Sequence, residues 1–316
     1  HRFSDLDCLG AATALASCIR GLGKCANVVV KQSQSLTPEL IKRYIDSGFG
    51  DLFLEPDDAL LNISGKTLLI ITDTHNPNLV ESEEILQAAE TVVVIDHHRK
   101  MVDHIDNAVI FFHEPYASSA SEMVAEMLQY IDGINMSRLD AESLLAGIML
   151  DTRSFVFKAG VRTFEAAAYL RRLGADTVEV KRMFSGSIET YKEKADIVAE
   201  TQMYKQAAIA VDRSGLGGQL RIAAAQAADE MLYIKGVEAS FVLFADEDSV
   251  NISARSLGDF NVQLVMEAMG GGGHLTMAGA RLANTTLEQA YNSLIEVIDR
   301  YKQDQHSRAL SLKNAY

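Results

Sequence analysis

The stretch Val92–His98, read V-V-V-I-D-H-H, most constrains how this chain can fold. Its four apolar residues do not alternate with polar ones, which is typical of a parallel strand buried on both faces. Asp96, His97 and His98 follow this strand directly. Ligands of open parallel sheets bind at the carboxyl ends of the strands. An isolated D-H-H would indicate only a solvated turn, but further segments of the chain repeat the pattern.

Other apolar runs also end in an acid. Leu68–Asp73 and Leu144–Asp151 have this form, and the chain starts with H-R-F-S-D-L-D. Imidazole and carboxylate ligands without thiolate suit manganese, iron(II) or zinc, and the excess of carboxylates favours manganese. Six ligands exceed what one ion takes while it keeps open positions, so we expect two ions. The candidate ligands are His1, Asp5, Asp7, Asp73, His97 and Asp151.

The charge balance limits the kind of substrate. The net charge is -14 and the isoelectric point about 5.0. Proteins that hold long nucleic acids through many phosphates present basic surfaces, and no run of lysine and arginine indicates one here. Two divalent ions would locally reverse the sign of the electrostatic field. We therefore expect a small phosphorylated ligand and no long nucleic acid.

The chain reads as a globular segment with no membrane contact of its own. No apolar run is long enough to span a bilayer, and no signal peptide is present. Three closely spaced cysteines, Cys8, Cys18 and Cys25, argue against a disulfide framework and for a reducing compartment. His1 already belongs to a ligand motif, so we interpret the chain as a fragment whose removed N-terminal part could hold a membrane anchor or a sensor.

The alternation of strands and helices predicts an α/β fold with a parallel sheet, followed by a smaller mixed α/β domain. We expect strands at 27–31, 68–72, 92–95, 108–112, 207–211, 220–224, 237–245 and 250–255. We expect helices at 9–19, from 38, and at 83–89, 118–131, 139–150, 163–173, 260–269 and 287–301. The predicted segments are a catalytic metal-binding domain at 1–185, a charged helical connector at 186–206, a substrate-binding domain at 207–302 and a frayed tail at 303–316.

The second domain contains the run Gly270–His274, four glycines and a histidine. Such a run has a high entropic cost and no evident packing value, so we expect a functional reason for it. Flexible backbone amides can surround a phosphate, and His274 adds a donor. The alternative is a flexible hairpin loop. Arg255, at the end of a predicted strand, is either a second phosphate or base contact or a surface arginine.

These motifs, in this order, resemble the DHH phosphoesterase superfamily with its DHH-associated C-terminal domain, over essentially the whole chain. The stretches S-D-L-D-C-L-G-A-A, T-D-T-H-N-P, I-D-H-H-R and E-P-Y-A-S-S-A-S-E-M are most similar to the cyclic-di-AMP phosphodiesterases of Gram-positive bacteria. In that family the module follows membrane helices, a PAS domain and a degenerate GGDEF domain. The resemblance implies a cytoplasmic domain of a membrane-anchored protein and a possible homodimer. Phe3-Ser4 and Met277 depart from the widespread superfamily pattern without removing a ligand.

The resemblance also implies roles for the candidate residues. One metal ion would be held by His1, Asp5 and Asp73. A second would be held by Asp7, Asp73, His97 and Asp151, with Asp73 bridging the two. Asp96 would orient a histidine and His98 would face the substrate phosphate, so that the catalytic motif is Asp96, His97 and His98. The nucleotide would be held across a cleft between the domains by Arg255, Gly271, Gly272, Gly273 and His274.

The resulting prediction is a manganese-dependent phosphodiesterase that opens cyclic di-AMP to linear pApA. Two ions that share a water lower its pKa, supply hydroxide and neutralise charge on the phosphate oxygens. One alternative is a nanoRNA hydrolase or 3′-phosphoadenosine-phosphate phosphatase on the same scaffold. Another is a catalytically silent cyclic-dinucleotide-binding sensor, which the complete ligand set disfavours.

Overall fold

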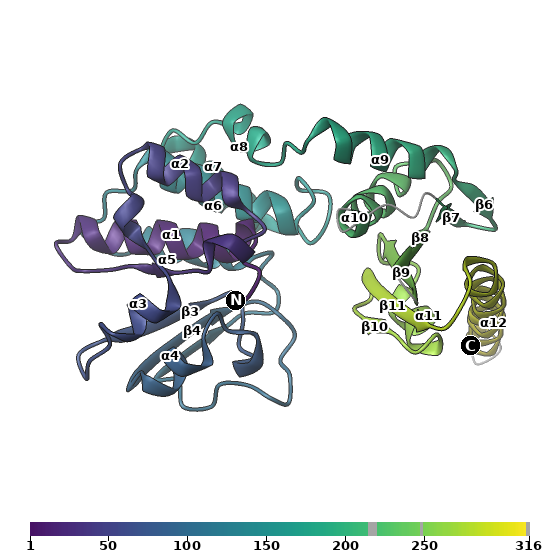
Figure 1. Cartoon of the computed structure of the whole chain (residues 1–316), viewed down its shortest axis with the longest axis horizontal. Coiled ribbons are helices and arrows are strands. Elements are labelled where there is room, and N and C mark those ends of the chain that lie inside the picture. The colour runs from purple at the N-terminus through teal and green to yellow at the C-terminus, as the bar shows by residue number, and fades with distance from the viewer. Residues whose placement is uncertain (214–219, 247–248, 314–316) are drawn as a thin grey trace. The chain divides into compact units, whose positions relative to one another are not determined.

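The computed structural model describes residues 1–213, 220–246 and 249–313. The chain divides into two compact units, His1–Ser185 and Gly186–Tyr316 (Figure 1). No helix within the described ranges is long and apolar enough to cross a membrane. The predicted α/β class is confirmed, with parallel strands in the first unit and a mixed sheet in the second.

The parallel strands of the first unit fall into two sheets. One has the order β3-β4-β5, and the other pairs β1 with β2. Of the predicted strand at 27–31 only two residues pair as a strand. The apolar side chains of β4 are mostly buried, as its sequence predicts. The strands are β1 (Val28–Val29), β2 (Phe53–Leu54), β3 (Leu68–Thr72), β4 (Thr91–Asp96) and β5 (Ile110–His113).

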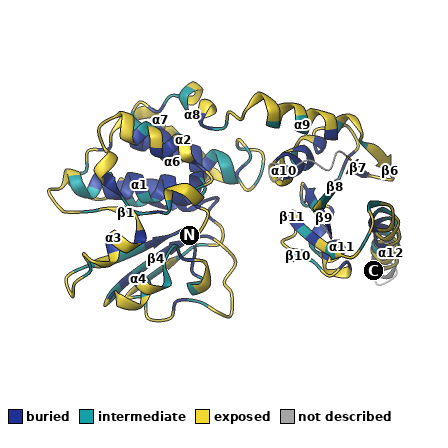
Figure 2. Ribbon diagram, in the orientation of Figure 1, coloured by how far each residue is buried: buried dark blue, intermediate teal, exposed yellow. Residues whose placement is uncertain are grey.

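Helices α1, α5 and α6 pack together and contribute many of the buried side chains of the first unit (Figure 2). Helices α1 and α6 approach closely because Gly10 has no side chain: a Cβ there would lie 2.5 Å from the Ser143 carbonyl oxygen. The helices of this unit are α1 (Leu6–Gly21), α2 (Pro38–Asp46), α3 (Pro56–Leu60), α4 (Glu83–Ala88), α5 (Ala120–Leu128), α6 (Arg138–Asp151), α7 (Val161–Arg172) and α8 (Thr177–Met183).

The second unit is built on a six-stranded mixed sheet with the order β10-β11-β9-β8-β7-β6. Alternate side chains of β8 enter two separate cores, because successive residues of a strand point to opposite faces. Phe241 packs with side chains of α11 and α12, whereas Val242 packs with those of α10. The elements are α9 (Ile188–Ala199), β6 (Gln202–Tyr204), β7 (Ala207–Asp212), α10 (Leu220–Met231), β8 (Ala239–Asp246), β9 (Ser249–Ser256), α11 (Val262–Ala268), β10 (Gly272–Gly273), β11 (Met277–Ala283) and α12 (Leu287–Lys313).

Three expectations are corrected in this unit. Residues 220–224 were expected to form a strand but begin α10, whose buried side chains recur every three to four residues, the spacing of a helix face. The frayed tail expected from 303 is instead helical as far as Lys313, as the continuation of α12. The residues of the predicted connector belong to this unit, since β6 pairs with β7.

Candidate metal centre

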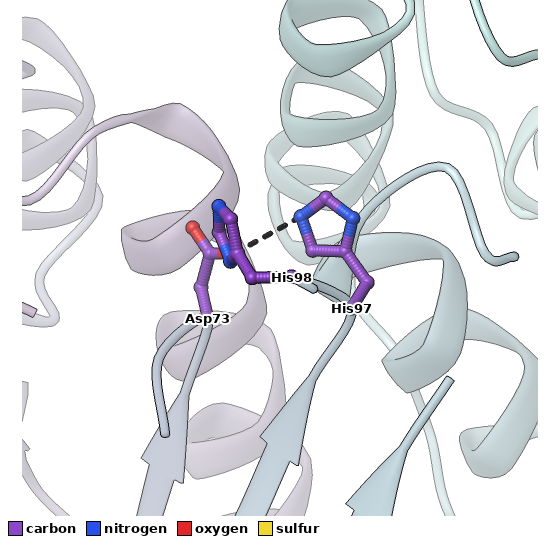
Figure 3. Close-up of side chains that lie close together, drawn as sticks. All are labelled: Asp73, His97 and His98. Atoms are coloured by element: carbon purple, nitrogen blue, oxygen red, sulfur yellow. Dashed lines mark ion pairs between the residues drawn. The ribbon is translucent and has the colours of Figure 1, made fainter. Parts of the chain in front are cut away.

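Two neighbouring strands deliver part of the site at their carboxyl ends. Asp73 directly follows β3, and its backbone N–H continues the ladder by donating to the Ile95 carbonyl at 2.8 Å. Its φ of 63° lies in the left-handed region, which a residue other than glycine rarely adopts. Asp96 ends β4, and His97 and His98 follow it. Figure 3 shows Asp73 close to His97 and His98.

The start of α1 delivers two more carboxylates. Asp5 is the N-cap, and its Oδ1 accepts the backbone N–H groups of Asp7 and Cys8, each at 3.0 Å. Caps of this kind and acids in the first turn are favoured at a helix N-terminus. The carboxylate of Asp7 is fully buried and accepts the N–H groups of Ala120 and Ser121, at 2.7 and 2.8 Å. The start of α5 therefore fixes the position of Asp7.

The six predicted ligands lie together in the first unit. His1 Nε2 is 3.2 Å from Asp73 Oδ2 and 3.8 Å from Asp5 Oδ1. His97 Nε2 lies 3.3 Å from Asp73 Oδ1, 3.7 Å from Asp7 Oδ2 and 3.2 Å from Asp151 Oδ2, Asp151 being the last residue of α6. The two oxygens of Asp73 thus face two different groups of ligands, one around His1 and the other around His97.

The polar atoms of this cluster fit a bound cation. Asp73 Oδ1 and both ring nitrogens of His97 are buried without a hydrogen-bond partner among the described residues. Buried polar atoms without partners are rare and point to an ion or water. Several groups of potential ligand atoms come close enough to share an ion. One is the first predicted set, His1, Asp5 and Asp73, and another contains Asp7, His97 and Asp151, the second predicted set without Asp73.

The protonation of the cluster shows how strongly its charges interact without metal. Burial and the nearby Asp73 raise the pKa of Asp5 to about 6 and that of Asp7 well above its usual value. Burial would lower the pKa of His97, but Asp151 and Asp73 raise it to about 11. Burial would also lower the pKa of His1, but the nearby Cys8, Asp73 and Asp5 raise it to about 11. Protons therefore take the place of cations in the metal-free site.

The carboxylate of Asp96 does not contact the ring of His97; it contacts those of His98 and His75. Its Oδ1 lies 2.8 Å from His98 Nδ1, and its Oδ2 is hydrogen-bonded to His75 Nδ1. Burial alone would raise the pKa of Asp96, but these two histidines lower it. The sequence alone indicates no role for His75, although this residue lies two residues after Asp73 in T-D-T-H-N-P.

Apart from His98, the candidate substrate residues lie in the second unit. Arg255 is buried on β9 rather than at the surface, with its Nε 3.4 Å from Asp229 Oδ1. The glycine run has a packing role that the sequence did not reveal. A Cβ at Gly271 would lie 2.1 Å from the Gly279 carbonyl oxygen, and one at Gly273 would lie 2.4 Å from Ala278 Cα. His274 is exposed and follows β10, and its N–H donates to the Met277 carbonyl.

Both halves of the chain match the models of known domain families. Residues 1–149 match the model of the DHH family, N-terminal domain, and residues 216–304 match the DHHA1 domain. The chain joins a DHH-family domain to a DHHA1 domain. The DHH match includes five of the six candidate ligands, and the DHHA1 match includes the glycine run and Arg255. Asp151 lies two residues beyond the DHH match.

This DHH–DHHA1 chain is similar to named relatives. It is 42% identical over 315 residues to the cyclic-di-AMP phosphodiesterase GdpP of Geobacillus thermodenitrificans, a match that covers 95% of this chain and 46% of that protein. It is 38% identical over 311 residues to the cyclic-di-AMP phosphodiesterase PdeA of Listeria monocytogenes, with 95% and 47% covered. The chain therefore spans about half the length of these relatives.

A solved structure shares the fold. The exopolyphosphatase-related protein from Bacteroides fragilis superposes with a TM-score of 0.81 at 23% identity, over 96% of this chain and 91% of that one. At this identity the likeness is one of fold, and the chemistry rests on the residues of this chain.

Proposed function

We propose that this chain is the hydrolytic module of a cyclic-di-AMP phosphodiesterase, which opens one phosphodiester bond of cyclic di-AMP to give linear pApA. The observation that carries the proposal is the largely buried set of carboxylates and imidazoles around Asp73, whose atoms Asp73 Oδ1 and His97 Nδ1 and Nε2 have no hydrogen-bond partner among the described residues. The identity to two proteins named cyclic-di-AMP phosphodiesterases, over 95% of this chain, supports the substrate.

The site would hold two divalent cations. His1, Asp5 and Asp73 would hold one, and Asp7, Asp73, His97 and Asp151 the other. Four carboxylates against two imidazoles favour Mn²⁺ among the divalent ions. Such ions supply Lewis acidity toward the phosphate oxygens and lower the pKa of a water molecule.

The side chains of the chain itself position these groups. The amides of Ala120 and Ser121 fix Asp7, and the cap bonds of Asp5 fix the first turn of α1. His98 is half-exposed, with its Nδ1 held by Asp96, so its Nε2 is the ring nitrogen available to a phosphate oxygen. Arg255, Gly271, Gly272, Gly273 and His274 would contact the nucleotide from the DHHA1 domain.

The test is turnover with Mn²⁺ present on four substrates: cyclic di-AMP, cyclic di-GMP, linear pApA and a short RNA. We expect cyclic di-AMP to be opened fastest, with pApA accumulating. A preference for pApA or short RNA would instead place the chain with nanoRNA hydrolases, and binding without turnover would indicate a sensor. Replacement of Asp96, His97 and His98 by alanine should abolish turnover while the far-ultraviolet circular dichroism is retained.

A further inference from the structure

His75 is a buried histidine next to the candidate centre that none of the roles above uses. Only 2% of its surface is exposed. Its Nε2 accepts the backbone N–H of Met101 at 2.9 Å. A ring nitrogen that accepts carries no proton, so the proton of this neutral imidazole lies on Nδ1. There it is donated to Asp96 Oδ2. The two bonds together select one tautomer of His75.

The same bonds join His75 to a further group of potential ligand atoms. His75, Asp96 and His113 offer ligand atoms close enough to share an ion. Both ring nitrogens of His75 are already engaged, however, by Met101 and Asp96. The Nε2 of His113 lies 2.5 Å from the carbonyl oxygen of His98. In this arrangement the group holds the segment after β4 in place.

Asp96 contacts His75 through Oδ2 and holds His98 through its other carboxylate oxygen, Oδ1. Asp96 is fully buried, and its Oδ1 accepts the N–H groups of His97 at 2.9 Å and His98 at 3.3 Å. The same oxygen lies 2.8 Å from His98 Nδ1. A carboxylate oxygen accepts, so His98 Nδ1 carries a proton. With His75 bound to Oδ2, the carboxylate cannot turn away from His98.

We propose that His75 is a positioning residue: through Asp96 it fixes the ring orientation and the tautomer of His98, the histidine that would face the substrate phosphate. The inference rests on the proposed function for the role of His98, but the contacts themselves are independent of the substrate. Residues that hydrogen-bond to a functional histidine on the side away from its ligand, and so orient its ring, contribute about 10–100-fold to activity in comparable sites.

Two substitutions separate the two bonds of His75. The side-chain amide of Asn occupies the place of Nδ1, so His75→Asn keeps the donor to Asp96 and loses the acceptor for Met101. The longer Gln reaches the place of Nε2, so His75→Gln keeps the bond to Met101 and loses the donor to Asp96. We expect kcat to fall about 10–100-fold in His75→Gln with a smaller change in KM, and most of kcat to be retained in His75→Asn. His104→Gln is the control, because His104 lies in the same segment, its Nδ1 contacts the Val102 carbonyl and its ring packs against Phe111, away from Asp96.

The ring of His98 provides a readout besides activity. In long-range ¹H–¹⁵N spectra of the protein loaded with diamagnetic Mg²⁺, wild type and His75→Asn should show a protonated Nδ1 at His98. His75→Gln should show a mixture of tautomers. Unchanged His98 signals in His75→Gln, or equal losses of kcat in both variants, would overturn the proposal, since the second result means that His75 only supports the fold. Absence of wild-type turnover on cyclic di-AMP would reject the proposed function, while the spectra would still decide the role of His75.

Discussion

Gly147 of α6 lies directly against the carboxylate of Asp7 at the start of α1. A Cβ at position 147 would be 2.8 Å from Asp7 Oδ1 and 2.1 Å from Ser121 Oγ. The position of Asp7, a candidate metal ligand on α1, therefore depends on the absence of a side chain at Gly147 of α6. Because Ser121 also donates its N–H to Asp7, both groups that define this position would be displaced together.

We expect Gly147→Ala to lower activity and Mn²⁺ affinity by at least about tenfold, because Asp7 must move. Overpacking of this kind also costs about 1–3 kcal/mol of stability. Urea unfolding and metal titration of the purified variant measure the two effects. Gly21→Ala is the matched control at the end of α1, where a Cβ would meet nothing within 4 Å. Wild-type metal affinity in Gly147→Ala would show that Asp7 is not a ligand.

The pH dependence of stability should reverse when metal is added. In the metal-free protein the pKa values of His1 and His97 are about 11, against 6.5 for an ordinary histidine. The folded state thus binds protons more tightly than the unfolded chain. This stabilisation is fully present below pH 6.5 and is lost as the pH rises toward 11.

With a chelator present, the free energy of unfolding should therefore fall on the order of 1 kcal/mol per pH unit for each of the two histidines above pH 6.5. With excess Mn²⁺ the stabilisation by metal should grow with pH, because binding requires neutral imidazoles and releases protons. Urea midpoints measured across this range with and without Mn²⁺ test both slopes. Parallel slopes in the two series would contradict the assignment of His1 and His97 as ligands.

Asp5 allows its capping role and its ligand role to be separated. Its Oδ1 accepts the N–H groups of Asp7 and Cys8, and the amide oxygen of Asn caps helices equally well. We expect Asp5→Asn to keep the stability of the metal-free protein and to lower Mn²⁺ affinity at least about tenfold. Asp5→Ala should lose both, with about 1 kcal/mol of stability for the cap. Calorimetric titration and thermal unfolding check the pair, and unchanged affinity in Asp5→Asn would remove Asp5 from the ligand set.

Local patterns account for what the sequence predicts well. The run V-V-V-I-D-H-H combines strand, strand end and ligands in seven adjacent residues, and the structure has β4 there. The run from Leu68 to Asp73 is equally local and forms β3 with an acid at its end. The prediction of a strand at 220–224 is wrong because five residues are too few to show the helical period of α10. Its buried face is visible only over the whole helix.

Contacts between distant residues account for what the sequence does not show. The N–H groups that hold Asp7 belong to Ala120 and Ser121, which follow Asp7 by 113 and 114 positions in the chain. Nothing in the sequence around Gly147 reveals that it faces a carboxylate, since a glycine inside a helix reads only as a weak helix former. The bond between His75 and Asp96 likewise depends on how the segments after β3 and β4 meet.

The glycine run of the DHHA1 domain combines a packing role with the proposed substrate role, and two adjacent glycines separate them. A Cβ at Gly271 would lie 2.1 Å from the Gly279 carbonyl oxygen, whereas one at Gly272 would meet nothing within 4 Å. We expect Gly271→Ala to lower the free energy of unfolding by about 1–3 kcal/mol, because β11 blocks the new methyl group.

Gly272→Ala should leave the stability unchanged and raise KM for the nucleotide roughly two- to tenfold. That change corresponds to the loss of one hydrogen bond of about 0.5–1.5 kcal/mol, as the methyl group keeps a phosphate away from the neighbouring Gly273 N–H, which is not part of the β10–β11 ladder. Urea unfolding and initial rates of both variants give the comparison. An unchanged KM in Gly272→Ala would mean that the run serves only the close packing of β10 on β11, and that the nucleotide is held elsewhere.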